Sequence, residues 1–195
     1  MGAGLGARGM VTLEERSATV SRMYRPRVLI VNVFFDHRRR SARPFSAIPV
    51  ALGPIYLAGA FHPHHCQVQL YNEQYSGPLE DPVLLGWPDM LVMTGLTIGF
   101  DRMRQLTAYA RTRNPRVIVV AGGPAVRALP SLSARIFDYA CSGDVEELRE
   151  VVADAFGHLY VAEEMLPRFD LTREFGRIAY LEASRNCNLS AASVP

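Results

Sequence analysis

Short apolar runs, each long enough for one buried strand, alternate along this chain with segments of helical pattern. Runs that are apolar throughout are typical of strands buried on both faces of a sheet. Strands that alternate with helices predict a parallel sheet covered by helices on both sides. The predicted strands are RVLIVNVFF (27–35), CQVQLY (66–71), DMLVMTGL (89–96), RVIVVAGG (116–123) and a weaker FDYACSG (137–143), and the predicted helices lie at 52–61, 100–113 and 144–156. This succession predicts a flavodoxin-like, doubly wound five-stranded α/β fold with extensions at both ends.

The strand and helix pattern divides the chain into three parts. Residues 1–26 are expected to form a flexible, glycine-rich extension that carries one short amphipathic helix. Residues 27–157 carry the α/β domain, and residues 158–195 follow as a linker and a carboxyl-terminal segment. The amphipathic helix exposes an apolar stripe that must pack on the domain or on a partner.

Capping signals mark two of the predicted helices. Thr12 and Glu15 have the spacing of a capping box at the start of the amino-terminal helix. Asp144 and Glu147 have the same spacing at the start of the last helix, and Gly157 is a typical stop after it. We therefore expect the last helix to begin at Asp144 and to end at Gly157.

Composition narrows the chemistry that the chain can perform. All 21 basic residues are arginine, so a Schiff-base lysine and the phosphate-binding lysine of a P-loop are both excluded. The net charge of +2 gives no indication of nucleic-acid binding. No apolar run approaches the roughly 20 residues of a membrane-spanning helix. Cys66, Cys141 and Cys187 have no paired spacing, which favours reduced thiols and a cytoplasmic protein.

Ligands of doubly wound sheets bind at the carboxyl ends of the strands, so the segments after the apolar runs are the candidate binding loops. Gly122 and Gly123 end a predicted strand, where backbone can approach a ligand closely or simply turn into the next helix. The hydroxyls of Thr94 and Thr97, beside Gly95, can hold the polar edge of a flat ligand or cap the following helix.

Two further clusters have both a functional and an ordinary interpretation. Arg38, Arg39, Arg40 and Arg43 follow the first strand, either as a solvated charge run or as a contact for phosphate, acidic protein or anionic lipid. The FHPHHC stretch (61–66) resembles a metal cluster superficially, but adjacent residues in a turn seldom converge on one ion. An exposed turn is the favoured interpretation there, and a separate enzyme acting through it is the weaker alternative.

The ordered succession of these loops resembles a known family. ALGPIYLAGAF, PDMLVMTGLT, VIVVAGGPAVRALP, FDYACSGDVEEL and LPRFDL followed by YLEASRNCNLS are together similar to the amino-terminal cobalamin-binding domain of cobalamin-dependent radical S-adenosylmethionine proteins. The resemblance implies cobalamin over the carboxyl edge of the sheet. It places the contacts at Thr94, Gly95, Leu96, Thr97, Gly122, Gly123, Pro124 and Gly143.

The chain departs from the family pattern in these same loops. Ala125 stands where the family often has histidine after GGP, and Asp144 stands where it tends to have glutamate. The DxHxxG run that supplies an axial histidine in other cobalamin proteins is missing, and Asp36 and His37 are side by side instead.

The last residues depart further. The family's CxxxCxxC motif holds an iron–sulfur cluster through three thiolates, and here Cys187 is followed by Ala191 and Val194 at the other two positions. Radical chemistry is therefore not expected, and the residues AASVP (191–195) are interpreted as the product of a frameshift inside the motif.

Two functions follow as expectations. The first is a non-catalytic remnant without cofactor, acting as an accessory or structural subunit of a larger assembly, of which a membrane-associated pigment–protein complex is one candidate. Its expected partner contacts are the amino-terminal extension, the arginine-rich loop and the carboxyl-terminal segment, with the loop also able to meet a membrane surface on the cytoplasmic side. The alternative is a stand-alone cobalamin-binding module, a carrier or sensor that serves a partner enzyme.

Overall fold

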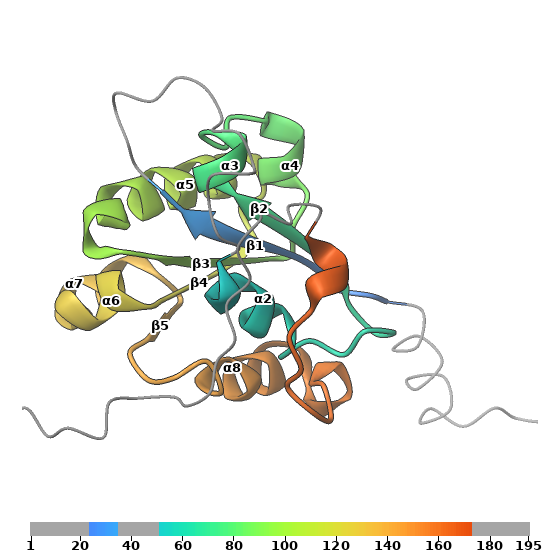
Figure 1. Ribbon diagram of the computed structural model, residues 1–195. Helices are drawn as coiled ribbons and strands as arrows, with labels where there is room; N and C mark the ends of the chain where they lie inside the picture. Colours follow the sequence, from blue (N-terminus) through green and yellow to red (C-terminus); the bar gives the residue numbers. More distant parts are fainter. Residues whose placement is uncertain (1–23, 35–50, 173–195) are drawn as a thin grey trace, which may run out of the picture.

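A five-stranded, all-parallel sheet with the strand order β2-β1-β3-β4-β5 forms the centre of the protein, as the sequence predicts (Figure 1). The computed structural model describes residues 24–34 and 51–172. In register, Leu29 of β1 lies opposite Gln69 of β2 and Leu91 of β3. The strands are β1 (Arg27–Val33), β2 (Gln67–Asn72), β3 (Met90–Gly95), β4 (Ile118–Gly122) and β5 (Tyr139–Cys141).

Helices cover both faces of the sheet (Figure 1). One face packs on α4 to α7, and the other packs on α2 and α8. The α-helices are α2 (Leu52–Ala58), α3 (Glu73–Ser76), α4 (Pro82–Gly86), α5 (Phe100–Arg113), α6 (Pro124–Ala128), α7 (Pro130–Ile136) and α8 (Glu147–Phe156). The 3-10 turns are η2 (Thr97–Gly99), η3 (His158–Tyr160) and η4 (Phe169–Leu171). Among the described residues, no helix is long and apolar enough to cross a membrane.

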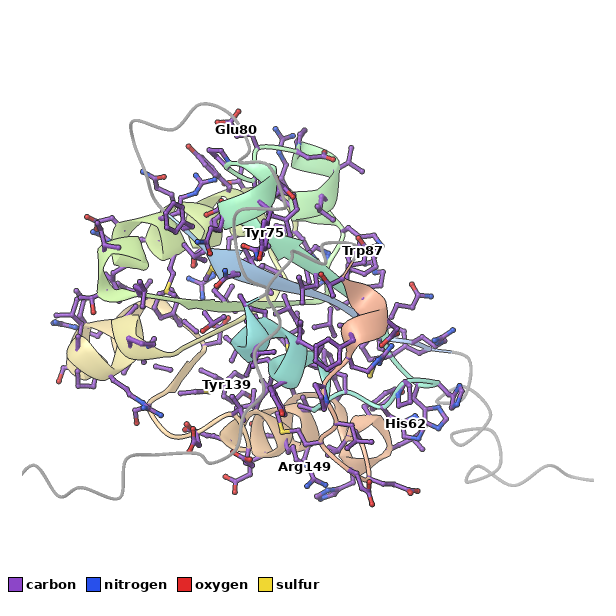
Figure 2. The ribbon with its side chains drawn as sticks, in the orientation of Figure 1. His62, Tyr75, Glu80, Trp87, Tyr139 and Arg149 are labelled. Carbon is purple, nitrogen blue, oxygen red and sulfur yellow. The ribbon has the colours of Figure 1, made fainter. Side chains whose placement is uncertain are left out.

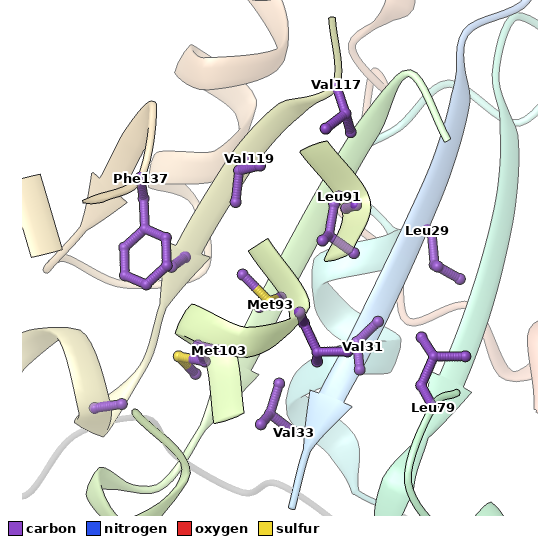
Figure 3. Close-up of a cluster of buried hydrophobic side chains, with 14 of the residues drawn as sticks. Leu29, Val31, Val33, Leu79, Leu91, Met93, Met103, Val117, Val119 and Phe137 are labelled. Carbon is purple, nitrogen blue, oxygen red and sulfur yellow. The ribbon is translucent and has the colours of Figure 1, made fainter. Parts of the chain in front are cut away.

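The two-sided core follows from the alternation of side chains along each buried strand. In β1, Leu29 and Val31 enter the cluster under α4, α5 and α6, which Figure 3 shows, whereas Val28 and Ile30 enter the cluster under α2 and α8. Each fully buried aliphatic side chain contributes about 1.5–3 kcal/mol relative to an exposed one. Both faces therefore stabilise the central strands, which explains why their sequence is apolar at almost every position.

A buried ion pair ties the carboxyl end of β1 to the helices beside it. The side chain of Glu73 is 0% exposed and that of Arg102 is 8% exposed, with 2.8 Å between Oε1 and Nη2. Glu73 also accepts hydrogen bonds from the backbone N–H groups of Phe34 (3.1 Å) and Leu79 (2.9 Å). One carboxylate thus joins the ends of β1 and α3 to α5.

The structure corrects one boundary and adds short helices. The last helix begins at Glu147 rather than at Asp144, and its N-cap, Glu146, makes no side-chain capping bond, so the predicted capping box is wrong. Gly157 does end the helix, with φ of 100°. Helices α3, α4, α6 and α7 were not predicted, because each has only four to seven residues and shows no clear apolar periodicity. The predicted amino-terminal helix with Thr12 and Glu15 lies outside the described residues.

Candidate functional site

A crevice with a cavity volume of about 180 Å³ lies at the carboxyl ends of β3, β4 and β5. Its floor is formed by the ends of the strands, including Thr94 and Gly122, and its sides by residues of α2, α6 and α8. Parallel strands bring their carboxyl ends to one edge, so residues far apart in the sequence meet there. This is the edge at which the sequence predicts a ligand.

The turn from β4 into α6 requires glycine. Gly123 has φ of 84°, in the left-handed region, and a Cβ atom placed on it would lie 2.8 Å from the hydroxyl oxygen of Thr94. Both the backbone conformation and the space therefore exclude a side chain. Thr94 faces this glycine, so its hydroxyl belongs to the packed floor of the crevice.

The loop after β5 is closed by two charged side chains of the domain itself. The Nε of Arg127 donates to the carbonyl of Ser142 at 2.9 Å, and its Nη2 donates to the carbonyl of Gly143 at 2.6 Å. The N–H of Gly143 donates to Oε2 of Glu147 at 2.7 Å. We call Arg127, Ser142, Gly143 and Glu147 the loop brace. The brace thus engages the carbonyl groups of Ser142 and Gly143 and the N–H group of Gly143.

Cys141 forms part of the crevice wall. Burial, and secondarily the negative charge of Glu147, raises the pKa of the Cys141 thiol to about 12. The thiol is therefore protonated near neutral pH and lacks the thiolate that a nucleophile needs. In this wall it acts as a small apolar side chain.

The structure brings together most of the residues that the sequence predicts for binding. Thr94, Gly122, Gly123, Pro124 and Gly143 all line the crevice. The other three predicted residues do not line it. Gly95 packs against β1, where an added Cβ would lie 2.9 Å from the carbonyl oxygen of Val33. Leu96 is 61% exposed and Thr97 is also exposed.

The helix-capping alternative for the two threonines is also wrong. The residues at the N-cap positions of η2 and α5 are Leu96 and Gly99, and neither makes a side-chain capping bond. Thr94 is still within β3, before the turn begins.

Several residues of the crevice were not predicted. Gly53 and Leu57 of α2 and Val145 and Leu148 near α8 line it, together with Arg127 of α6. Apolar residues at helical spacing give no sign of which helix end will face a crevice. The only available signal was the position of Arg127, shortly after the predicted glycine turn.

The histidine turn is not part of the crevice, because none of His62, His64 and His65 lines it; Figure 2 shows His62 on the turn, well separated from Tyr139 of β5. His64 is exposed, as an exposed turn requires. Burial and the neighbouring His65 lower the pKa of His62. Cys66 is buried, and burial raises the pKa of its thiol to about 11. Within the described ranges, no group of three or more histidine, cysteine or acidic residues could hold a metal ion.

Residues 35–50 and 173–195 lie outside the described residues, so the proposed roles of the arginine-rich loop (Arg38, Arg39, Arg40 and Arg43) and of Cys187 stay predictions.

A scan against protein-family models and searches of curated proteins and solved structures found no match for the chain. The strand order and the position of the crevice define a flavodoxin-like, doubly wound α/β domain.

Cobalamin, which the family resemblance implies, fits the described residues poorly. The cavity of about 180 Å³ is below the roughly 300–1,000 Å³ of pockets for drug-sized ligands, and a corrinoid is larger than such ligands. The backbone groups of Ser142 and Gly143 are engaged by the loop brace. We therefore derive no chemistry through cobalamin.

Proposed function

We propose that this protein is a non-catalytic accessory subunit that keeps a cobalamin-domain-like fold as a scaffold within a larger assembly. The observation that carries the proposal is the loop brace. At the edge where a doubly wound domain binds its ligand, Arg127 and Glu147 bond the loop of Ser142 and Gly143 at distances of 2.6–2.9 Å. Groups that would serve a ligand thus stabilise the domain itself.

Exposed apolar side chains at the same edge favour a protein partner. Leu96 is 61% exposed and Ile98 is 70% exposed, both in or next to η2, which follows the carboxyl end of β3. The buried core of a protein–protein interface is more apolar than the rest of the protein surface. The arginine-rich loop and both chain ends, predicted as partner contacts from the sequence, are the remaining parts of the proposed surface.

A stand-alone cobalamin-binding module is the second candidate. It is favoured by one observation: five of the residues implied by the family resemblance, Thr94, Gly122, Gly123, Pro124 and Gly143, line one crevice. In this alternative the loop brace must open when the corrinoid binds, because its carbonyl and N–H groups are otherwise engaged.

Purification from the native source under mild conditions tests the proposal, with an absorbance spectrum and identification of every polypeptide that co-purifies. We expect a colourless protein held at a fixed ratio in a large complex. A corrinoid spectrum without a stoichiometric partner would overturn the accessory-subunit proposal and support the second candidate.

A titration of the purified chain with hydroxocobalamin separates the two candidates further. The accessory-subunit proposal predicts no saturable change in absorbance. The second candidate predicts saturable binding that is lost when Leu148→Trp fills the crevice. The matched control is Leu159→Trp, since Leu159 is 45% exposed and does not line the crevice.

A further inference from the structure

The sheet has two edges, and they differ in how they are protected. β5, at one edge, has only three residues, and such short edge strands resist pairing with other chains. β2, at the other edge, has six residues with the sequence QVQLYN, without a charged residue or a proline. It therefore lacks most of the features by which edge strands avoid unwanted pairing, which leaves coverage by another segment as the remaining protection.

The backbone groups that β2 presents at its open edge follow from its pairing with β1. The N–H of Gln67 donates to the carbonyl of Pro26 at 2.9 Å, so Gln67 faces β1. Because successive residues of a strand direct their backbone groups to opposite sides, Val68 and Leu70 face away from β1. Neither backbone N–H makes a hydrogen bond within residues 24–34 and 51–172.

A groove runs along this open edge. It has a volume of about 530 Å³ and is lined on one side by Val68, Gln69, Leu70 and Asn72 and on the other by Asp170, Leu171 and Thr172. Figure 1 shows η4 beside the β2 edge of the sheet. The backbone N–H groups of Val68 and Leu70 are therefore unmet donors on the β2 side of this groove, within the part of the chain that the structure describes.

The chain itself leads into this groove. Thr172, the last described residue, lines it, and the sequence continues with REFG (173–176) and RIAYLE (177–182). The segment 177–182 has the length of β2 and contains isoleucine and tyrosine, which favour strands. Four intervening residues span at most about 14 Å, and because Thr172 already lines the groove, the segment can reach it.

We infer that residues 177–182 of the same chain bind along the open edge of β2 as a sixth strand, accepting hydrogen bonds from the N–H groups of Val68 and Leu70. This pairing is independent of the function proposed above. It converts an unprotected edge into an internal strand, and it holds the segment after residue 182 beside the sheet.

Amide hydrogen exchange of the full-length, isotope-labelled chain tests this pairing. We expect the N–H groups of Val68 and Leu70 to be protected. Proline should be introduced in two single variants, Ala179→Pro and Tyr180→Pro. Successive residues of a strand direct their N–H groups to opposite sides, so one of these two N–H groups donates to β2 in the proposed pairing and is removed by proline. At least one variant should accelerate exchange at both amides by about tenfold, the loss of a net hydrogen bond.

Two controls identify the cause of any change. The amide of Gln69 faces β1 and should keep its exchange rate in every variant. Ala192→Pro, which places the same residue elsewhere in the carboxyl-terminal segment, should leave Val68 and Leu70 protected. Rapid exchange of both amides in the unaltered chain overturns the inference, and so does protection that survives both proline variants. Protection that increases with protein concentration also overturns it, because a second copy then supplies the strand.

Discussion

Replacing Glu73 with glutamine should cost this protein a large part of its stability. In the structure the carboxylate is fully buried and accepts hydrogen bonds from Arg102 and from the backbone N–H groups of Phe34 and Leu79. Both oxygens of the Glu73 carboxylate accept hydrogen bonds. A glutamine amide replaces one of these oxygens with an NH₂ group, which in either orientation of the amide faces a hydrogen-bond donor and cannot accept from it. Arg102 is then also left as an uncompensated buried charge.

Removing one partner of a buried ion pair costs about 3–5 kcal/mol. For a chain of this size, such a loss lowers Tm by about 6–20 °C. The free energy of unfolding of a typical domain is about 5–15 kcal/mol. The Glu73→Gln variant should therefore still fold, but with a small remaining free energy of unfolding. Urea unfolding followed by far-ultraviolet circular dichroism measures the free energy of unfolding directly.

Glu80→Gln is the matched control, since Glu80 is exposed and makes no hydrogen bond that the structure records within the described residues. It should change the free energy of unfolding by less than about 0.5 kcal/mol. A loss below about 1 kcal/mol for Glu73→Gln would refute the assignment of Glu73 as a central acceptor.

A double variant separates the charge from the backbone contacts of Glu73. Replacing both partners of a buried ion pair with apolar residues is often neutral. Here Glu73→Leu combined with Arg102→Leu should still destabilise, because the N–H groups of Phe34 and Leu79 lose their acceptor at about 1–3 kcal/mol each. A double variant as stable as the unaltered protein would show that these two backbone bonds contribute nothing.

Four further measurements test the crevice and the amino ends of the strands. Gly123→Ala should lower the free energy of unfolding by about 1–3 kcal/mol in urea titrations, because φ is 84° and the added Cβ meets Thr94; an unchanged value would contradict this account. Cys141 should react with iodoacetamide at pH 8 at least about a hundredfold more slowly than a free thiol, since its pKa is raised to about 12. The folded state keeps this proton while the unfolded thiol loses it near pH 9, so Cys141→Ala should reduce the fall of stability above pH 9. Burial raises the pKa of Asp89, but hydrogen bonds from Arg27 outweigh it and lower this pKa overall. The ionised Asp89 carboxylate therefore stabilises the folded state above the pKa of the unfolded chain, and this stabilisation is lost as the pH falls through the lower pKa of the folded state. Asp89→Asn should therefore flatten acid unfolding below about pH 4, and an unchanged acid transition would count against the pairing.

The strands were predictable because burial on both faces leaves a direct trace in the sequence. The side chains of residues 28–31 point alternately to the two faces of the sheet, and both faces are buried, so all four residues must be apolar. The apolar run that contains them therefore predicts β1 without any knowledge of the fold. The long helix α5 (Phe100–Arg113) was predicted with its bounds, because its apolar residues recur on one face. Chain order and the rules for parallel sheets then give the fold class.

The short helices and the details of the crevice were not predictable in this way. α3 holds Glu73 in the core through a bond to Arg102, and nothing local to either residue indicates that they meet. The same applies to Arg127, which reaches the loop of Ser142 and Gly143. Contacts of this kind depend on the distance between elements after folding, which no short sequence pattern encodes.

The sequence by itself determined the fold class and indicated Thr94, Gly122 and Gly123 at the carboxyl edge, because hydrophobic periodicity and turn chemistry act over a few residues. Only the tertiary structure decided what that edge can do. It placed Thr94 against Gly123, and it turned Glu147 from a predicted helix cap into the partner of Gly143. The physical reason is that hydrogen bonds between distant segments form only after the sheet has brought those segments together.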